Sequence, residues 1–157
     1  MKITIEMLEK MGACKNGLDQ FADSYPDGTT IKNLVEKINN KHWLGWLVSR
    51  RVKITRACLA AGADVHAYND FALRNAAKGG RYEIVKLLVE AGADVHAEDD
   101  FALREAAENG RFEIVKYLVE AGADVHAWYG CALRMAKKEN HTKIIEYLEN
   151  HIEKETK

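Results

Sequence analysis

The sequence predicts an all-α fold in which helix-loop-helix units are repeated along the chain. The hexapeptide Gly-Ala-Asp-Val-His-Ala occurs at 62–67, 92–97 and 122–127, with a period of 30 residues. Segments 71–100 and 101–130 differ at eight of 30 positions. Apolar residues recur at helical spacing, and the chain contains a single proline, Pro26. These observations predict stacked helical pairs rather than a sheet.

Residues 1–40 precede the repeat, and three short amphipathic helices are expected there. Thr4 and Thr30 stand where the first and third helices would begin, and threonine is a favoured N-cap residue. Turn residues at 25–28 separate the second helix from the third. Two interpretations remain open, a helical cap that covers the first repeat or a separate recognition module. The apolar residues at helical spacing are Met7, Leu8 and Met11, then Leu18, Phe21, Ala22 and Tyr25, then Ile31, Leu34, Val35 and Ile38.

The remaining residues, 41–157, are expected to form the repeat domain. The first copy is degenerate, with Trp43 and Trp46 where Leu73 and Ala76 stand one period later. The last copy drifts into a polar C-terminus, as the end of a repeat array requires, because its outer face meets water. The predicted units are 41–70, 71–100, 101–130 and a C-terminal cap at 131–157.

Each unit is predicted to contain two helices. In the second copy, the first helix covers 71–78 and ends at Gly79 and Gly80. The second helix covers 82–91 and ends at Gly92, where a left-handed residue is needed. The small side chains of Ala76 and Ala77 would let neighbouring helices approach closely, so that stacked copies bury a continuous core.

The unit resembles the ankyrin repeat. Residues 83–97 read Glu-Ile-Val-Lys-Leu-Leu-Val-Glu-Ala-Gly-Ala-Asp-Val-His-Ala, close to the family's second helix and exit loop. Residues 71–81 keep the Leu, the Ala pair and a Gly of its first helix. The resemblance extends from residue 41 to the early 150s. It implies a right-handed α-solenoid that binds a protein partner through its concave face.

Two departures from the family pattern bear on the binding surface. The Thr-Pro that opens the family's first helix is replaced by Phe71-Ala72. The period is 30 rather than 33 residues, and the missing residues fall between Ala97 and Phe101, where the family builds a projecting hairpin. We therefore expect short fingers and a binding surface shifted toward the first helices. Such shortened repeats resemble arrays in large DNA viruses and microbes.

Candidate partner-binding residues are those that vary between otherwise similar copies, because packing holds core positions fixed. Trp128 and Tyr129 stand out, since the preceding copy has Glu98 and Asp99 in their place and aromatic residues are frequent interface anchors. The alternative is that they pack against the last repeat as part of its cap. The further candidates are Glu98, Asp99, Lys78, Glu108, Asn109, Lys138, Asn75 and Glu105.

Arg74, Arg104 and Arg134 recur at the position of the family's first-helix histidine, and two roles are open for them. They are placed to support the preceding turn by hydrogen bonds, with carboxylates such as Asp70 or Asp100 as acceptors. Alternatively, they form an exposed basic row that grips a partner's carboxylates or phosphates. Arg74 and Arg104 are therefore included among the candidate binding residues.

The composition limits the class of partner and the cellular compartment that can be expected. With 23 Lys and Arg against 24 Asp and Glu, the net charge of −1 gives no reason to expect nucleic acid. No apolar run approaches the ~20 residues that a bilayer requires, so no membrane association is expected. Cys14, Cys58 and Cys131 are interpreted as free thiols in a reducing compartment, which with the absence of a signal peptide favours the cytoplasm.

No catalytic residue, metal ligand or cofactor is predicted. The sequence has no phosphate-binding glycine loop and no His-Glu-x-x-His motif. His66, His96 and His126 lie in successive copies, too far apart to share one zinc ion, so a structural ladder that ties exit loops together is expected instead. Cys58 falls on a core position and is expected to be buried and inert.

The sequence therefore predicts a monomeric, non-enzymatic protein–protein interaction module whose partner it does not identify. Two alternatives use the same scaffold. One is a viral or phage inhibitor of a host defence enzyme. The other is a small-molecule or nucleic-acid binder that uses the arginine row.

Overall fold

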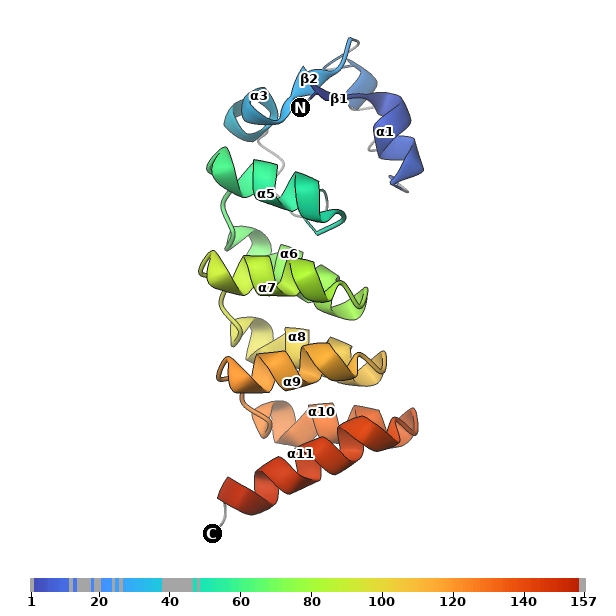
Figure 1. The fold of residues 1–157 in the computed structure, drawn as a ribbon, viewed down its shortest axis with the longest axis vertical. Coiled ribbons are helices and arrows are strands. Elements are labelled where there is room, and N and C mark those ends of the chain that lie inside the picture. Colours follow the sequence, from blue (N-terminus) through green and yellow to red (C-terminus); the bar gives the residue numbers. More distant parts are fainter. Residues whose placement is uncertain are drawn as a thin grey trace.

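The chain forms an elongated stack of helical pairs (Figure 1). The computed structural model describes residues 2–11, 13, 18, 21–23, 25, 27–37, 47 and 49–155. Helices α6, α8 and α10 form one layer, and α7, α9 and α11 lie in front of them. The elements are β1 (Lys2–Ile3), α1 (Ile5–Lys10), β2 (Thr29–Thr30), α3 (Ile31–Lys37), α5 (Val52–Ala60), α6 (Ala67–Lys78), α7 (Tyr82–Glu90), α8 (Ala97–Glu108), α9 (Phe112–Glu120), α10 (Ala127–Lys138) and α11 (Thr142–Glu155).

The predicted all-α class and the helical pairs are confirmed. Helix α7 follows the predicted second helix, and α6 ends at Lys78 as expected. The left-handed Gly92 ends α7, with a φ of 97°. Its N–H donates to the Val89 carbonyl at 3.0 Å, and the N–H of Ala93 donates to the Leu88 carbonyl at 2.9 Å. This is the Schellman arrangement, in which the last carbonyls of the helix find donors.

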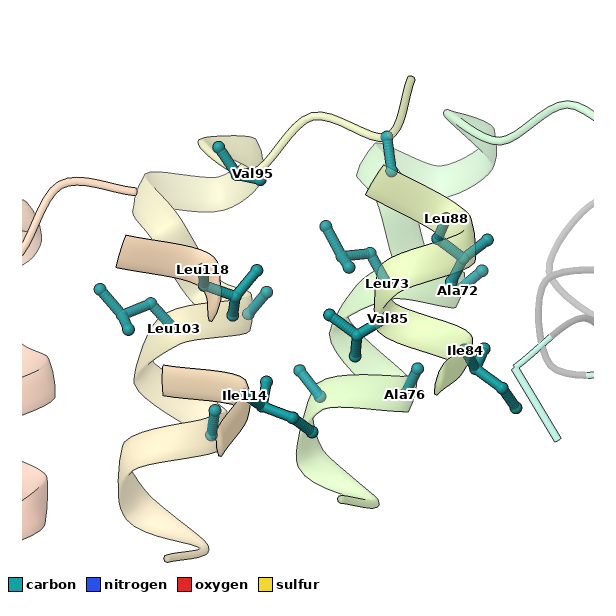
Figure 2. Close-up of a cluster of buried hydrophobic side chains, with 14 of the residues drawn as sticks. Ala72, Leu73, Ala76, Ile84, Val85, Leu88, Val95, Leu103, Ile114 and Leu118 are labelled. Carbon is teal, nitrogen blue, oxygen red and sulfur yellow. The ribbon is translucent and has the colours of Figure 1, made fainter. Parts of the chain in front are cut away.

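One hydrophobic core runs through the whole stack. Figure 2 shows Leu73 and Val85 of one repeat on the side that faces Ile114 and Leu118 of the next, while Leu103 lies on the far side of α8. These side chains are at most 2% exposed. Alanines at the helix contacts are buried as completely and carry no side chain beyond Cβ, which allows α6, α8 and α10 to pack closely. The stacking of repeats therefore buries what a single helical pair would leave exposed.

The N-terminal segment is tied to the array and includes a feature that was not expected. The N-caps at Thr4 and Thr30 are confirmed, since each hydroxyl oxygen accepts a backbone N–H three residues later at 3.3 Å. However, β1 and β2 form an antiparallel pair that joins Ile3 to Thr29. Two-residue strands are too short to show alternation in the sequence. The side chain of Ile3 belongs to the same core cluster as the repeats.

Several sequence expectations fall outside the described residues. They concern Trp43, Trp46, Ile38 and Cys14, and also the boundary placed between residues 40 and 41. The first copy is represented by α5 and the loop that follows it. Helices α6 to α11 form three pairs that correspond to the later copies.

Candidate protein-binding face

Each first helix is preceded by a turn of left-handed backbone. Tyr68, Asn69 and Asp70 have φ values between 53° and 56°, and the same conformation recurs at 98–100 and 128–130. The right-handed part of α6 therefore begins at Phe71, as predicted. Left-handed backbone costs about 1–2 kcal/mol for most residues, so the surrounding contacts must hold these turns. No strand occurs between residues 49 and 155, which agrees with the expected shortening of the fingers.

The arginine row supports these turns. The guanidinium of Arg74 donates to the Tyr68 carbonyl at 2.8 Å. Arg104 donates from Nη2 to the Glu98 carbonyl at 2.8 Å and from Nε to the Asp99 carbonyl at 3.1 Å. The supporting role is therefore the one that the structure shows, with backbone carbonyls as acceptors where carboxylates were expected. The planar guanidinium of arginine can donate to two successive carbonyls at once, so it supports a backbone turn better than the single ammonium group of a lysine would.

The guanidinium groups also stack between aromatic rings of successive repeats. The Cζ atom of Arg74 lies 5.9 Å from the ring centroid of Phe71 and 5.3 Å from that of Phe101. The Cζ atom of Arg104 lies 4.9 Å from the ring of Phe101 and 4.6 Å from that of Trp128. Rings and cations thus alternate across three copies, and each cation–π contact contributes about 0.5–1 kcal/mol at an exposed site.

The last left-handed turn presents two large aromatic side chains to solvent. Trp128 is 55% exposed and Tyr129 is 89% exposed. Tyr68, on the equivalent turn two copies earlier, is 52% exposed. Together with Phe71 and Phe101, these residues form what we call the aromatic face. Neither Trp128 nor Tyr129 is buried against the last repeat.

The exit loops are joined by aspartates rather than by the histidines alone. Asp70 and Asp100 are only 3% and 4% exposed. An oxygen of Asp70 accepts the N–H of Asp94, in the next exit loop, at 2.9 Å, and Asp100 accepts the N–H of Asp124 at 2.8 Å. The exit loops are therefore tied together, but by aspartates that had been considered only as partners of arginine and not by the histidines that were expected to do so.

The histidines of the ladder contact these aspartates within one loop. Nδ1 of His96 lies 3.2 Å from the carboxylate of Asp100, and His66 pairs with Asp70 at 3.3 Å. Burial raises the pKa of Asp100, while the N–H of Asp124 and the nearby His96 act to lower it. Across the described residues, no group of three or more His, Cys, Asp or Glu is placed to hold a metal ion.

Several predicted binding residues lie between the first helices and couple neighbouring repeats. Lys78 pairs with Glu105 at 3.0 Å, and the Glu105 side chain is only 12% exposed. Asn75 donates to the Ser49 hydroxyl at 2.7 Å. Variation between copies therefore marks contacts between repeats as well as free surface. Of the other candidates, Glu98 bonds to Asn69, Asn109 to the Glu105 carbonyl, Lys138 to Glu139, and the Glu108 carbonyl to His141.

The described cysteines lie in the core. Cys58 is fully buried, and burial raises the pKa of its thiol to about 12. Cys131 is 1% exposed, on the packing position that phenylalanine occupies in the preceding copies. The predicted burial of Cys58 is confirmed, and since the thiolate is the reactive form of cysteine, the raised pKa disfavours reaction at neutral pH.

Stacked helical pairs, exit loops joined along one edge and an exposed aromatic face define an α-solenoid of the repeat-protein class. The family model for ankyrin repeats (three copies) matches residues 11–128, well over half of the chain. The chain therefore belongs to the ankyrin repeat family, whose repeats are generally protein–protein interaction modules. No curated protein matches the sequence. Among the described helices, none is both long and apolar enough to span a membrane.

Proposed function

We propose that this protein binds a protein partner through the concave face of the array, with Trp128 and Tyr129 as the anchor residues. The observation that carries the proposal is their exposure, 55% and 89%, on a turn whose Tyr129 carbonyl accepts a hydrogen bond from the Arg134 guanidinium at 3.4 Å. Aromatic side chains of this size bury 150–250 Å² each on association, which makes exposed pairs effective anchors.

The arrangement around Trp128 favours binding over a purely structural role. Arg104 stacks on the indole ring at 4.6 Å and also holds the preceding turn. The ring is therefore positioned before a partner arrives, and less conformational entropy is lost on association. Tyr129 is left almost entirely to solvent, although the turn that carries it needs no aromatic side chain. The equivalent turn at 98–100 has acidic residues instead.

The test compares partner recovery by three forms of the purified protein from a lysate of the source organism. We expect the double variant Trp128→Ala and Tyr129→Ala to lose a protein that the wild type recovers. The control is the double variant Lys86→Ala and Lys116→Ala, because these side chains are 47% and 48% exposed and lie on second helices, away from the aromatic face. The recovered protein is then purified for titration calorimetry.

The test requires both the affinity for the recovered protein and the helix content of each form. Circular dichroism should show the same helix content for all three forms, since the changed side chains are exposed. Loss of affinity in the double variant alone supports the proposal. Equal affinity of the wild type and the double variant would show that these two residues are not the anchors.

A further inference from the structure

A second surface lies at the other end of the helices, between the N-terminal segment and the array. A cleft of about 990 Å³ separates α1 from the starts of α5 and α7. Figure 1 shows α1 above the end of α5 that is remote from the loop leading to α6. The cleft is therefore distinct from the aromatic face, which is built by the left-handed turns and the first helices.

Positive charge is concentrated in this cleft. Its basic lining residues are Lys10, Arg50, Arg51, Lys53 and Arg81, against two acidic ones, Glu6 and Glu83. Glu6 is already paired with Lys10 at 2.6 Å. The local balance is thus clearly positive, whereas the whole chain carries a net charge of −1.

The cations are crowded together. Burial lowers the pKa of Arg81, and the nearby guanidinium groups of Arg50 and Arg111 lower it further. Arg50 is held by a bond from Nη2 to the Met11 carbonyl at 2.9 Å. Arg81 donates to the Asn75 carbonyl at 3.1 Å. These bonds fix the guanidinium groups near one another, so an anion in the cleft would relieve their mutual repulsion.

Two of these cations are departures from the repeat. Lys53 stands where the next two copies have Glu83 and Glu113, and Arg50 stands where they have glycine. Acidic residues near a helix N-terminus are favourable, so the lysine is not the choice that α5 itself would favour. The first copy has therefore lost a negative charge and gained two positive ones on the wall of this cleft.

The cleft also has an apolar lining. Met7 and Val52 are partly exposed within it, and Ile54 and Ile84 close its base. Tyr82 forms one side, with its ring packed edge-on against Tyr117 at 5.7 Å. Methionine adapts its shape to different apolar surfaces, which suits a binding wall. A ligand that complements this cleft needs both negative charge and apolar side chains.

We propose that this cleft binds an acidic, amphipathic peptide segment of a partner protein. Its apolar side chains would contact Met7, Val52 and Tyr82, and its carboxylates would pair with Arg51 and Lys53. Arginine presents a planar fork that matches a carboxylate. Two glutamates on the walls and the apolar base disfavour a nucleic-acid backbone, whose binding depends on phosphate neutralisation.

The probe is a fluorescein-labelled peptide of Glu, Leu and Ala, about 14 residues long to give nearly four helical turns, with leucines on one face. Fluorescence anisotropy measures its Kd for the full chain. The double variant Arg51→Glu and Lys53→Glu should weaken binding by about tenfold, which corresponds to 1.4 kcal/mol. Both changes place acids at the start of α5, where Lys53→Glu gives the residue type that the next two copies have at Glu83 and Glu113, so the fold should be retained.

The matched control is Lys86→Glu with Lys116→Glu, which makes the same change in net charge on exposed positions of α7 and α9 outside the cleft. We expect it to change the Kd by no more than about twofold, since exposed charge pairs contribute little. A peptide with Gln in place of Glu should bind more weakly than the acidic probe. The Trp128→Ala and Tyr129→Ala variant should bind the probe normally, which separates this site from the aromatic face.

Three results would overturn the proposal. The first is no binding of the acidic probe by the wild type. The second is an equal loss in the control variant, which would indicate a general effect of net charge. The third is tighter binding of a single-stranded oligonucleotide than of the peptide, which would assign the cleft to a phosphate backbone.

Discussion

Asp70 and Asp100 are buried side chains whose carboxylates accept hydrogen bonds from the following exit loop. The third copy has Gly130 at this position. In that last repeat the second helix, α11, continues to Glu155, so there is no exit loop whose backbone N–H an aspartate at position 130 could accept. His126 contacts Glu155 instead, with a distance of 3.0 Å from Nε2 to the carboxylate. An aspartate thus stands at this position where a following exit loop needs a hydrogen-bond acceptor, and a glycine stands there where no such loop follows.

Replacement of Asp100 by alanine should destabilise the protein by about 1–3 kcal/mol, because the N–H of Asp124 loses its acceptor in a partly buried site. Urea denaturation followed by circular dichroism gives the free energy of unfolding. Asp100→Asn is the control, since its amide oxygen can still accept the bond and asparagine tolerates left-handed backbone. Equal losses in the two variants would show that the bond to Asp124 contributes nothing.

Among the elements, those set by local spacing were predictable and those set by distant contacts were not. The helical pairs and the caps at Thr4 and Gly92 follow from residues within one or two turns. The pairing of β1 with β2 joins segments far apart in the sequence and leaves no local pattern. The left-handed turns were also missed, because Tyr68 and Trp128 have no preference for that backbone. The turns are instead supported by arginines later in the chain, since Arg74 donates to the Tyr68 carbonyl and Arg134 donates to the Tyr129 carbonyl.

Packing between elements is tested by Leu103→Ala in α8, where the leucine is fully buried between neighbouring helices (Figure 2). The loss should be about 2–5 kcal/mol, the range for large-to-small changes in a core. Leu87→Ala makes the same chemical change at a half-buried site on α7 and should cost less. Thermal and urea unfolding measure both. A negligible loss for Leu103 would contradict the packing of α8 described here.

At the scale of the whole molecule, each repeat is stabilised by its immediate neighbours. Helix α8 packs against both α6 and α10, and the core is continuous along the stack. The sequence predicted this architecture because the repeat itself encodes it. The aromatic face was predictable only in part, since the variable positions included residues such as Glu105 that lie between helices. The basic cleft was not predicted, because it forms only when α1 lies against the array.

Removal of residues 131–157 should weaken the neighbouring copy most. The loss of α11 and of α10 from Cys131 onward exposes the core surface of α8 and α9, whereas α6 and α7 keep both of their neighbours. Hydrogen exchange measured by mass spectrometry should therefore show a larger loss of protection in 101–130 than in 71–100. A uniform loss along the chain would indicate that the array unfolds as a single cooperative unit.

The near identity of 71–100 and 101–130 has a consequence for how the chain can change in evolution. Both copies present the same buried apolar residues to their neighbours, such as Leu73 and Leu103 or Leu88 and Leu118. A duplicated 30-residue segment would therefore meet compatible surfaces on both sides. Recombination between these copies can lengthen or shorten the protein by whole units, moving Trp128 and Tyr129 relative to the basic cleft by one repeat at a time.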